Sequence, residues 1–336
     1  MSSPQLGSPQ TEHNSSHNSS HNASHNAGDA AQAVDAPKGA SLKVQRVLAM
    51  ILLLCQGGIT VTGSLVRVTG SGLGCDTWPM CHEGSLVPVA GSAPWIHQLI
   101  EFGNRTLTFV VAAASIAVLV AVVRAGRRSG IKSLAAVSLG GVVLQAVIGG
   151  ISVLLDLKWW AVAVHFLPSM VLVAVAAVLY MRIAEPDDVA PTRRVPKAAV
   201  TWAIIAAIAL VFVLVTGTMV TGSGPHAGDA TAGLEGRLEM DTRVLAYVHA
   251  ICLYLYLIAT LVTVYKLRRH KAPSDAMRTA LVLIVLILIQ WAIGVIQFRL
   301  GVPRWTIPAH IAMSSTVVAF TAFLWAHSSR RLPTLV

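Results

Sequence analysis

The main pattern along the chain is a series of eight long apolar runs separated by short polar segments. The runs cover about 45–66, 97–123, 133–155, 160–182, 197–220, 244–266, 277–298 and 306–327. Each can cross the apolar core of a bilayer, which takes roughly 20 helical residues. A cleaved signal peptide is not expected, because a long polar segment precedes the first run. The pattern predicts an all-α integral membrane protein with eight transmembrane helices.

The eight runs form two similar halves, 45–182 and 197–327. At one constant offset, residues of the first half recur in the second as Gln145 and Gln290, Gly149 and Gly294, Trp160 and Trp305, and His165 and His310. Residues 62–66 (TGSLV) likewise resemble 216–220 (TGTMV). Because each half has an even number of helices, the repeat is parallel, with a pseudo-twofold axis along the membrane normal. We expect two four-helix bundles, in which the mid-helix glycines allow close helix packing.

The charges predict how the chain is oriented. It has 25 Lys and Arg against 15 Asp and Glu, a net charge of +10. With a cytoplasmic N-terminus, 18 of the 25 basic residues fall in the tail, the loops on that side and the C-terminus. This positive-inside bias predicts a protein of the cell membrane with both termini in the cytoplasm, and it accounts for the net charge without a nucleic-acid partner.

Residues 1–40 have low complexity and are rich in His, Asn and Ser. Four histidines recur there every four residues: His13, His17, His21 and His25. We expect a disordered cytoplasmic tail, with adventitious metal binding as the alternative.

Three histidines fall inside the apolar runs. His165, His249 and His310 each lie four or five residues into a run that starts at the outer face. At 1.5 Å per residue they share a depth of roughly 6–8 Å. Ionisable residues inside a bilayer are costly and usually functional. We expect His249 and His310, from facing helices of one bundle, to bind a haem near the outer face. Interhelical hydrogen bonding is the alternative.

The first half departs from the second at one position. The residue equivalent to His249 is Asn104, whose amide is a poor ligand for haem iron, so His165 has no histidine partner. A haem with two axial histidines suits electron transfer, whereas a single ligand leaves the iron open for oxygen chemistry. His97 could replace the missing ligand, but two helical turns, roughly 10 Å, separate it from Asn104. We therefore expect the second half to be an electron-transfer site and the first half to be the site of the reaction.

Two further ionisable residues are candidates. Glu101 lies one turn before Asn104, so we expect it to face the same pocket, and the repeat places Ala246 at its position in the second half. A lone carboxylate could relay protons or bind a substrate hydroxyl, while an ion pair with Arg105 is the alternative. Arg67, at the outer end of the first run, could pair with a haem propionate or snorkel to the interface.

The first outer loop holds Cys75 and Cys81, with five residues between them. Outside the cell a disulfide can persist, so we expect these cysteines to pair; two independent thiols are the alternative. Four tryptophans near the outer face are expected to be interface anchors: Trp78, Trp159, Trp160 and Trp305.

Together these stretches resemble the haem A synthase family over residues 45–327. The resemblance is carried by 65–81 (LVRVTGSGLGCDTWPMC) and by 100–105 (IEFGNR), where the family usually has Glu-x-x-His-Arg. It is completed by 145–150 with His165, and by 290–294 with His249 and His310. The resemblance implies an oxidoreductase that converts the C8 methyl of haem O to a formyl group through hydroxylated intermediates, and supplies haem A to cytochrome c oxidase.

The resemblance also implies roles for individual residues. Haem b would lie between His249 and His310, and the substrate haem O would lie in the first half at His165, with Glu101 at the catalytic acid position. Cys75 and Cys81 match cysteines proposed to form a redox-active disulfide. Implied partners are haem O synthase, cytochrome c oxidase assembly factors and an electron donor of unknown identity.

Two features depart from the family pattern. Asn104 puts two-histidine ligation of the substrate haem in doubt. The stretch 222–226 (GSGPH) stands where some relatives have a second cysteine pair, so a thiol relay through that loop is not supported.

Two other functions remain open. A di-haem electron-transfer cytochrome would explain the histidines, but not Glu101 or the missing histidine at Asn104. A haem chaperone or transporter would return haem unchanged, and a transporter more often has helices broken at mid-membrane, which this pattern does not predict.

Overall fold

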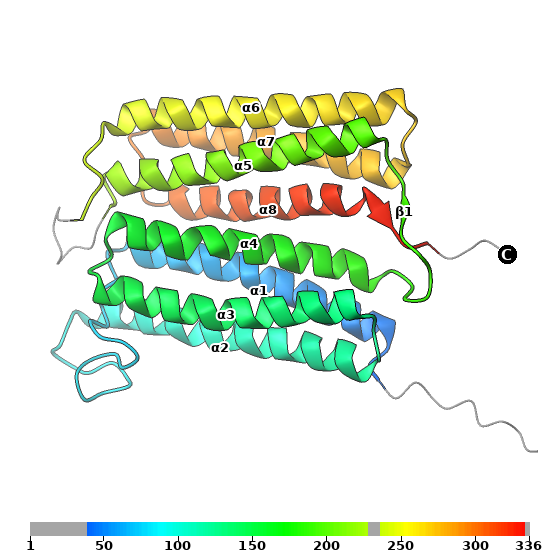
Figure 1. The fold of residues 1–336 in the computed structure, drawn as a ribbon. Coiled ribbons are helices and arrows are strands. Elements are labelled where there is room, and N and C mark those ends of the chain that lie inside the picture. The colour runs from blue at the N-terminus through cyan, green and yellow to red at the C-terminus, as the bar shows by residue number, and fades with distance from the viewer. Residues whose placement is uncertain (1–38, 228–235, 333–336) are drawn as a thin grey trace, which may run out of the picture. The chain divides into compact units, whose positions relative to one another are not determined.

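The computed structural model describes residues 39–227 and 236–332. Within them lie eight helices long and apolar enough to cross a membrane, which confirms the predicted eight-helix architecture (Figure 1). The elements are α1 (Leu42–Val68), α2 (Trp95–Arg124), α3 (Ser129–Leu154), α4 (Trp159–Ile183), β1 (Thr192–Arg193), α5 (Lys197–Ser223), α6 (Thr242–Arg269), α7 (Ser274–Arg299), α8 (Thr306–Ala326) and β2 (Ser329–Arg330). The tail histidines His13, His17, His21 and His25 lie outside the described residues.

Most helices extend beyond the apolar runs that predicted them. Helix α6 begins at Thr242 because the side chain of Asp241 accepts hydrogen bonds from the first backbone N–H groups, which lack partners within the helix. Such polar end turns carry no apolar signal. As a consequence, His249 lies seven positions after the first residue of α6, and His165 six after the first of α4, rather than four or five.

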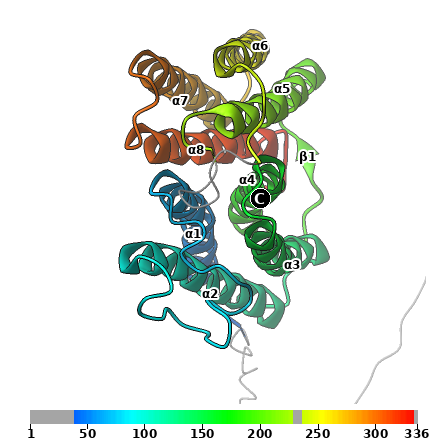
Figure 2. The same ribbon diagram turned by 90° about the vertical axis from the view of Figure 1, so that its left-hand side faces the viewer.

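The helices pack as two sets of four with the same internal order. In the first half, α1 and α3 each pack against α2 and α4; in the second half, α5 and α7 each pack against α6 and α8. Between the halves, α4 packs on α8, and the pairs α1–α8 and α4–α5 also meet (Figure 2). Because those two pairs are equivalent under the repeat, the packing is that of a pseudo-twofold pair of bundles.

Side chains at equivalent positions of the two halves also touch. The hydroxyl of Ser315 on α8 contacts the sulfur of Met170, its repeat equivalent on α4, at 3.8 Å. Ser315 also shares a 2.9 Å hydrogen bond with Thr60 of α1. Nη2 of Arg67 lies 3.5 Å from the carbonyl oxygen of Thr221, again its equivalent. Two equivalent residues can meet only near the pseudo-twofold axis, so the Ser315–Met170 contact places α4 and α8 beside it, and the side chain of Arg67 reaches across it from α1 to α5.

The outward faces of the helices suit lipid. Large apolar side chains such as Leu54, Phe109 and Val171 are exposed along the helices. Continuous apolar exposure of this kind marks a surface that another apolar phase covers. Many polar groups within the helices pair with one another, as where the hydroxyls of Tyr256 and Thr321 share a 2.6 Å hydrogen bond.

The two ends of the helical unit differ in charge. We call the end that carries residues 69–94 the loop end and the opposite one the tail end. At the tail end, the buried carboxylate of Glu185 accepts from Arg128 at 2.9 Å and Arg182 at 2.7 Å, and Arg330 lies 3.7 Å away. Strand β1, in the linker between the halves, pairs antiparallel with β2 after α8. This network therefore joins the linker to the end of the second half.

Glu185→Gln is expected to lower the thermal unfolding midpoint of the purified protein in detergent. The change leaves three guanidinium groups without a buried counter-charge, and breaking a buried ion pair typically costs roughly 3–5 kcal/mol. The matched control is Asp187→Asn, because Asp187 binds the same cluster with its side chain 35% exposed and should contribute about 1 kcal/mol or less. Equal shifts in the two variants would contradict a central role for Glu185.

Candidate functional site

Two of the intramembrane histidines face each other in the second half. The imidazole rings of His249 on α6 and His310 on α8 have centroids 6.4 Å apart and planes inclined by 52°. Metal–imidazole bonds are about 2 Å long, so one iron between two rings would separate their centroids by roughly 6 Å. The pair therefore has the spacing that two axial haem ligands require.

The ring of His249 is oriented by α5. Its Nδ1 donates to the carbonyl oxygen of Val213 at 3.0 Å and lies 3.2 Å from the hydroxyl of Thr216. A carbonyl can only accept, so the proton is on Nδ1 and Nε2 keeps a free lone pair. Gly217 makes room for the ring, because a Cβ there would lie 3.2 Å from Cε1 of His249. One helix turn thus sets both the tautomer and the position of this imidazole.

The ring of His310 is oriented by α7. The amide of Gln290 donates to the backbone carbonyl of His310 at 3.2 Å and to the hydroxyl of Ser314 at 2.7 Å, and it lies 3.0 Å from Nε2 of the ring. Gly294 faces the ring, with a Cβ position 3.4 Å from Cε1. Nδ1 of His310 is buried without a hydrogen-bond partner. An orphaned buried nitrogen at such a site is consistent with a group that binds there.

The first half repeats this arrangement around His165. The amide of Gln145 donates to the carbonyl of His165 at 2.7 Å and to the hydroxyl of Ser169. Gly149 faces the ring, with a Cβ position 3.0 Å from Cε1. Nδ1 of His165 is buried without a partner, like its equivalent. The mid-helix glycines predicted to permit close packing therefore do so specifically against the imidazoles.

His165 has no second histidine opposite it in the first half, as the sequence predicts. The residue at the position of His249 is Asn104, whose side-chain oxygen accepts a 2.7 Å hydrogen bond from Thr62 of α1. Thr62 is the equivalent of Thr216, so the same threonine position anchors a histidine in one half and an amide in the other. Across residues 39–227 and 236–332, a contact between two histidine rings occurs only in the second half.

Glu101 is buried, at 4% exposure, and holds the first loop. One carboxylate oxygen accepts from the backbone N–H of Cys75 at 2.7 Å, and the other accepts from the guanidinium of Arg105. Arg105 in turn donates to the carbonyls of Cys75 and Thr77, at 2.7 and 2.8 Å. The ion pair considered as the alternative for Glu101 is therefore present.

The loop that Glu101 holds contains a disulfide between Cys75 and Cys81, the pairing expected from the sequence. Both cysteines are buried, at 0% and 1% exposure. Beside them His82 is also buried; its ring nitrogens bond Asp76 at 2.8 Å and Gln98 of α2 at 2.9 Å. The loop is therefore packed against the first half through these contacts.

His97 and Arg67 lie at the loop end as well. Nδ1 of His97 bonds the hydroxyl of Ser71 at 2.8 Å, so this ring is engaged with the start of the loop. Arg67 reaches Thr221 with Nη2, while its Nε is buried without a partner. A buried guanidinium nitrogen with no acceptor fits a site for a carboxylate such as a propionate.

Trp78, expected to be an interface anchor, also makes a contact with a helix. Its ring packs against Gly150 of α3, where a Cβ would lie only 2.3 Å from ring atom Cδ2. The indole is 37% exposed, so one edge remains open. Sequence reasoning missed this contact because it joins a loop to a helix far along the chain. The available signal was that the repeat replaces Gly150 with Val295.

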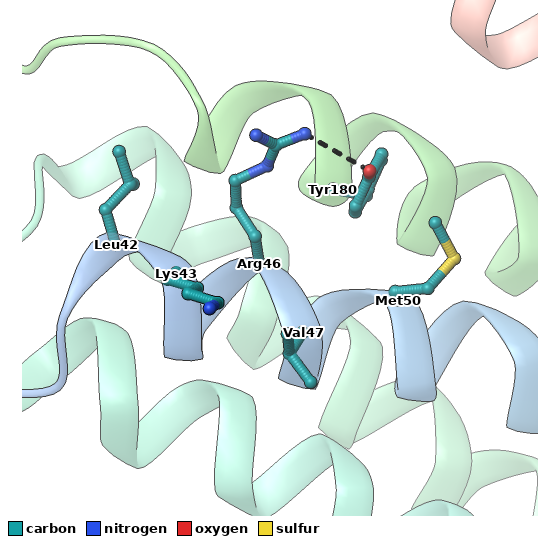
Figure 3. A pocket seen from close by; sticks show the side chains of 6 residues that line it. All are labelled: Leu42, Lys43, Arg46, Val47, Met50 and Tyr180. Carbon is teal, nitrogen blue, oxygen red and sulfur yellow. Dashed lines mark hydrogen bonds between the residues drawn. The ribbon is translucent and has the colours of Figure 1, made fainter.

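A groove of about 460 Å³ lies at the tail end, between α1 and α4 (Figure 3). Its floor and rim are formed by Leu42, Lys43, Arg46, Val47, Met50 and Tyr180. Arg46 donates a 3.2 Å hydrogen bond to the hydroxyl of Tyr180. The groove opens at the opposite end of α1 from Thr62 and Arg67, so it is separate from the histidine sites.

If His249 binds haem, Thr216→Val should reduce haem retention of the purified protein, by up to about tenfold. The loss is limited because the carbonyl of Val213 still accepts the hydrogen bond from Nδ1 of His249. Valine keeps the shape of threonine but removes the hydroxyl beside the ring. The matched control is Thr218→Val, since that hydroxyl donates to Val215 within its own helix. The measurement is the haem-to-protein absorbance ratio. Identical ratios in the two variants would show that the hydroxyl of Thr216 does not contribute to haem binding.

Comparison with known proteins places these features in a family. The family described as COX15-CtaA, cytochrome oxidase assembly protein, matches residues 46–322. The Heme A synthases of Listeria monocytogenes serovar 1/2a (strain ATCC BAA-679 / EGD-e) and Listeria innocua serovar 6a are each 26% identical over 303 residues, 86% of this chain and 96% of theirs. The Heme A synthase of Lysinibacillus sphaericus (strain C3-41) is 37% identical over 134 residues, 38% of this chain and 41% of its own. Because the family match spans nearly the whole eight-helix region, the chain belongs to the COX15-CtaA family of cytochrome oxidase assembly proteins.

Proposed function

We propose that this protein is a haem A synthase, an oxidoreductase that converts the C8 methyl of haem O to a formyl group through hydroxylated intermediates. The observation that carries the proposal is the contact between the rings of His249 and His310 in the second half, with His165 at the position equivalent to His310 in the first half. Relatives named Heme A synthase, aligned over 86% of the chain, support it.

The second half would hold the resident haem b, with His249 and His310 as axial ligands. Bound there, the haem would supply one-electron transfer. The residues around it keep the ligands ready: Val213 and Thr216 hold the proton on Nδ1 of His249, and Gln290 fixes the backbone that carries His310. The 6.4 Å ring separation and the orphaned Nδ1 of His310 fit this group.

The first half would bind the substrate haem O. His165 provides one ligand, and Asn104, held by Thr62, leaves the opposite side without a second histidine. Glu101 would accept a hydrogen bond or proton from the hydroxyl of partly oxidised substrate. Arg67, with its free Nε at the loop end, would pair with a propionate.

We further propose that the loop end faces the outside of the cell membrane and that both termini lie in the cytoplasm. The distribution of basic residues supports this orientation. It places the Cys75–Cys81 disulfide on the oxidising side, where such bonds persist. Haem O synthase would deliver the substrate, cytochrome c oxidase assembly factors would take the product, and a separate electron donor would supply the electrons.

The test is expression of the full chain in a host that makes haem O but lacks haem A, followed by haem extraction and mass spectrometry. We expect haem A or its hydroxylated precursor. Recovery of unmodified haem alone from folded protein, with a working reductant, would overturn the proposal. That outcome would favour the two alternatives: an electron-transfer cytochrome or a haem chaperone.

A further inference from the structure

The tip of the first loop bridges two helices of the first half. The ring of Trp78 packs against Gly150 on α3, with ring atoms 2.3–2.6 Å from where a Cβ would stand. The carbonyl of the preceding residue, Thr77, accepts a 2.8 Å hydrogen bond from Arg105 on α2. The loop tip is therefore attached to both helices, through the indole on α3 and through the backbone of Thr77 on α2.

The turns that hold the loop are also those that carry the pocket residues. On α3, Gly150 directly follows Gly149, which faces the ring of His165. On α2, Arg105 directly follows Asn104, the residue at the position of the missing histidine. On α3 the ring of Trp78 therefore packs one residue along from the glycine that faces His165, and on α2 the residue before Trp78 is bound one residue along from Asn104.

Three groups that hold this loop have no counterparts at the equivalent positions of the second half. The groups involved are the carboxylate of Glu101, the guanidinium of Arg105 and the space at Gly150. Their equivalents in the second half are Ala246, Ala250 and Val295. Neither alanine can form these bonds, and the side chain of Val295 would fill the space that receives the indole. The half that docks the loop is thus the half that lacks a second axial histidine.

We propose that Trp78 is a positioning residue that forms one wall of the substrate pocket, seated on α3 in the space that Gly150 leaves. The proposal rests on the proposed function and deepens it. Turning a methyl into a formyl group takes more than one oxidation step, so the hydroxylated intermediate must stay bound between steps. If Trp78 stays docked, the pocket retains the hydroxylated intermediate, and if the loop opens, the intermediate leaves before the last oxidation.

Two variants disturb the contact from opposite sides. Trp78→Ala removes the ring, and Gly150→Ala keeps the ring but places a methyl group where it stands. Each has a matched control in the same half: Trp95→Ala removes an exposed tryptophan at the start of α2, and Gly140→Ala adds a methyl on α3 with no atom within 4 Å. Trp78→Phe, which retains a smaller ring, serves if Trp78→Ala does not fold.

The first readout is independent of catalysis. Cys75 and Cys81 are buried, so a water-soluble phosphine can reduce their disulfide in the purified full chain only when the loop opens. We expect reduction to become at least about tenfold faster in both test variants, equivalent to about 1.4 kcal/mol of lost docking. The two controls should match the wild-type rate. An unchanged rate in Trp78→Ala and Gly150→Ala would overturn the docking contact itself.

The second readout is the haem extracted during turnover. In both test variants we expect the hydroxylated intermediate to become the major product, whereas the wild type and the controls make mainly haem A. If the loop opens faster but the product distribution stays that of the wild type, Trp78 does not form a wall of the substrate pocket. If the wild type makes no haem A, the proposed function fails, and the reduction rates still report whether the loop docks as described.

Discussion

His310→Ala is expected to abolish the low-spin haem b spectrum of the purified protein. The variant removes one of the two rings that face each other at 6.4 Å, and no other histidine ring contacts His249 within the described chain. Loss of an outer hydrogen-bond partner of a metal ligand typically costs 10–100-fold in affinity, so loss of the ligand itself should exceed about 100-fold. The measurement is the visible spectrum together with the haem-to-protein ratio, and His249→Ala should behave alike.

The matched control is His327→Ala. His327 follows α8 at the tail end, where its Nε2 bonds Thr279 at 3.0 Å. This variant should keep the spectrum of the wild type. A full haem complement in both His249→Ala and His310→Ala would eliminate the second half as a haem site and leave the duplication without its electron-transfer role.

Glu101→Gln is expected to reduce haem A formation by about 100-fold or more, because positioned proton transfer contributes typically 10²–10⁴ to a rate. The variant loses the charge, the proton-accepting ability and the buried ion pair with Arg105. A glutamine oxygen can still accept the hydrogen bond from the N–H of Cys75, and Arg105 still donates to the loop carbonyls of Cys75 and Thr77. The rate of disulfide reduction therefore measures how far the lost ion pair loosens the loop. Glu101→Ala also removes the hydrogen bond from Cys75. Product yield is measured by mass spectrometry, alongside the rate of Cys75–Cys81 reduction.

The pair of variants separates two roles that the geometry gives to one carboxylate. If Glu101→Gln keeps normal turnover and only Glu101→Ala loses it, the residue holds the loop and is no acid or base. If both lose turnover while Glu101→Gln keeps the slow disulfide reduction of the wild type, the carboxylate acts in the reaction.

The sequence was sufficient for the helices and for the pairing of the halves. Apolar runs of transmembrane length identify helices whatever surrounds them, and the constant offset between His165 and His310 predicts that their surroundings are alike. The structure shows this likeness in detail: Gln145 and Gln290 bind the backbone carbonyl of the histidine on the next helix. Local pattern and repeat therefore predicted the fold and the facing histidines.

Contacts made by loops could not be predicted in the same way. No periodicity relates Trp78 to Gly150 or Cys75 to Glu101, because each contact joins an irregular segment to a helix that other interactions position. The sequence did show that Glu101 occurs in one half only. Catalysis was the reason inferred for it, and the structure adds a second reason, the anchoring of the loop. A repeat indicates where the halves differ but not why.

The pairing of β1 with β2 bears on how such a protein can arise. The chain enters the second half at β1 and leaves it at β2, and Thr192 lies opposite Arg330. A four-helix unit whose ends are neighbours resembles the domains that tolerate insertion and permutation, because their termini lie close together. An even number of helices also returns the chain to the side of the bilayer from which it started. Tandem gene duplication could therefore copy this unit without inverting it, and the two copies could then diverge at single positions, as Asn104 and His249 have done.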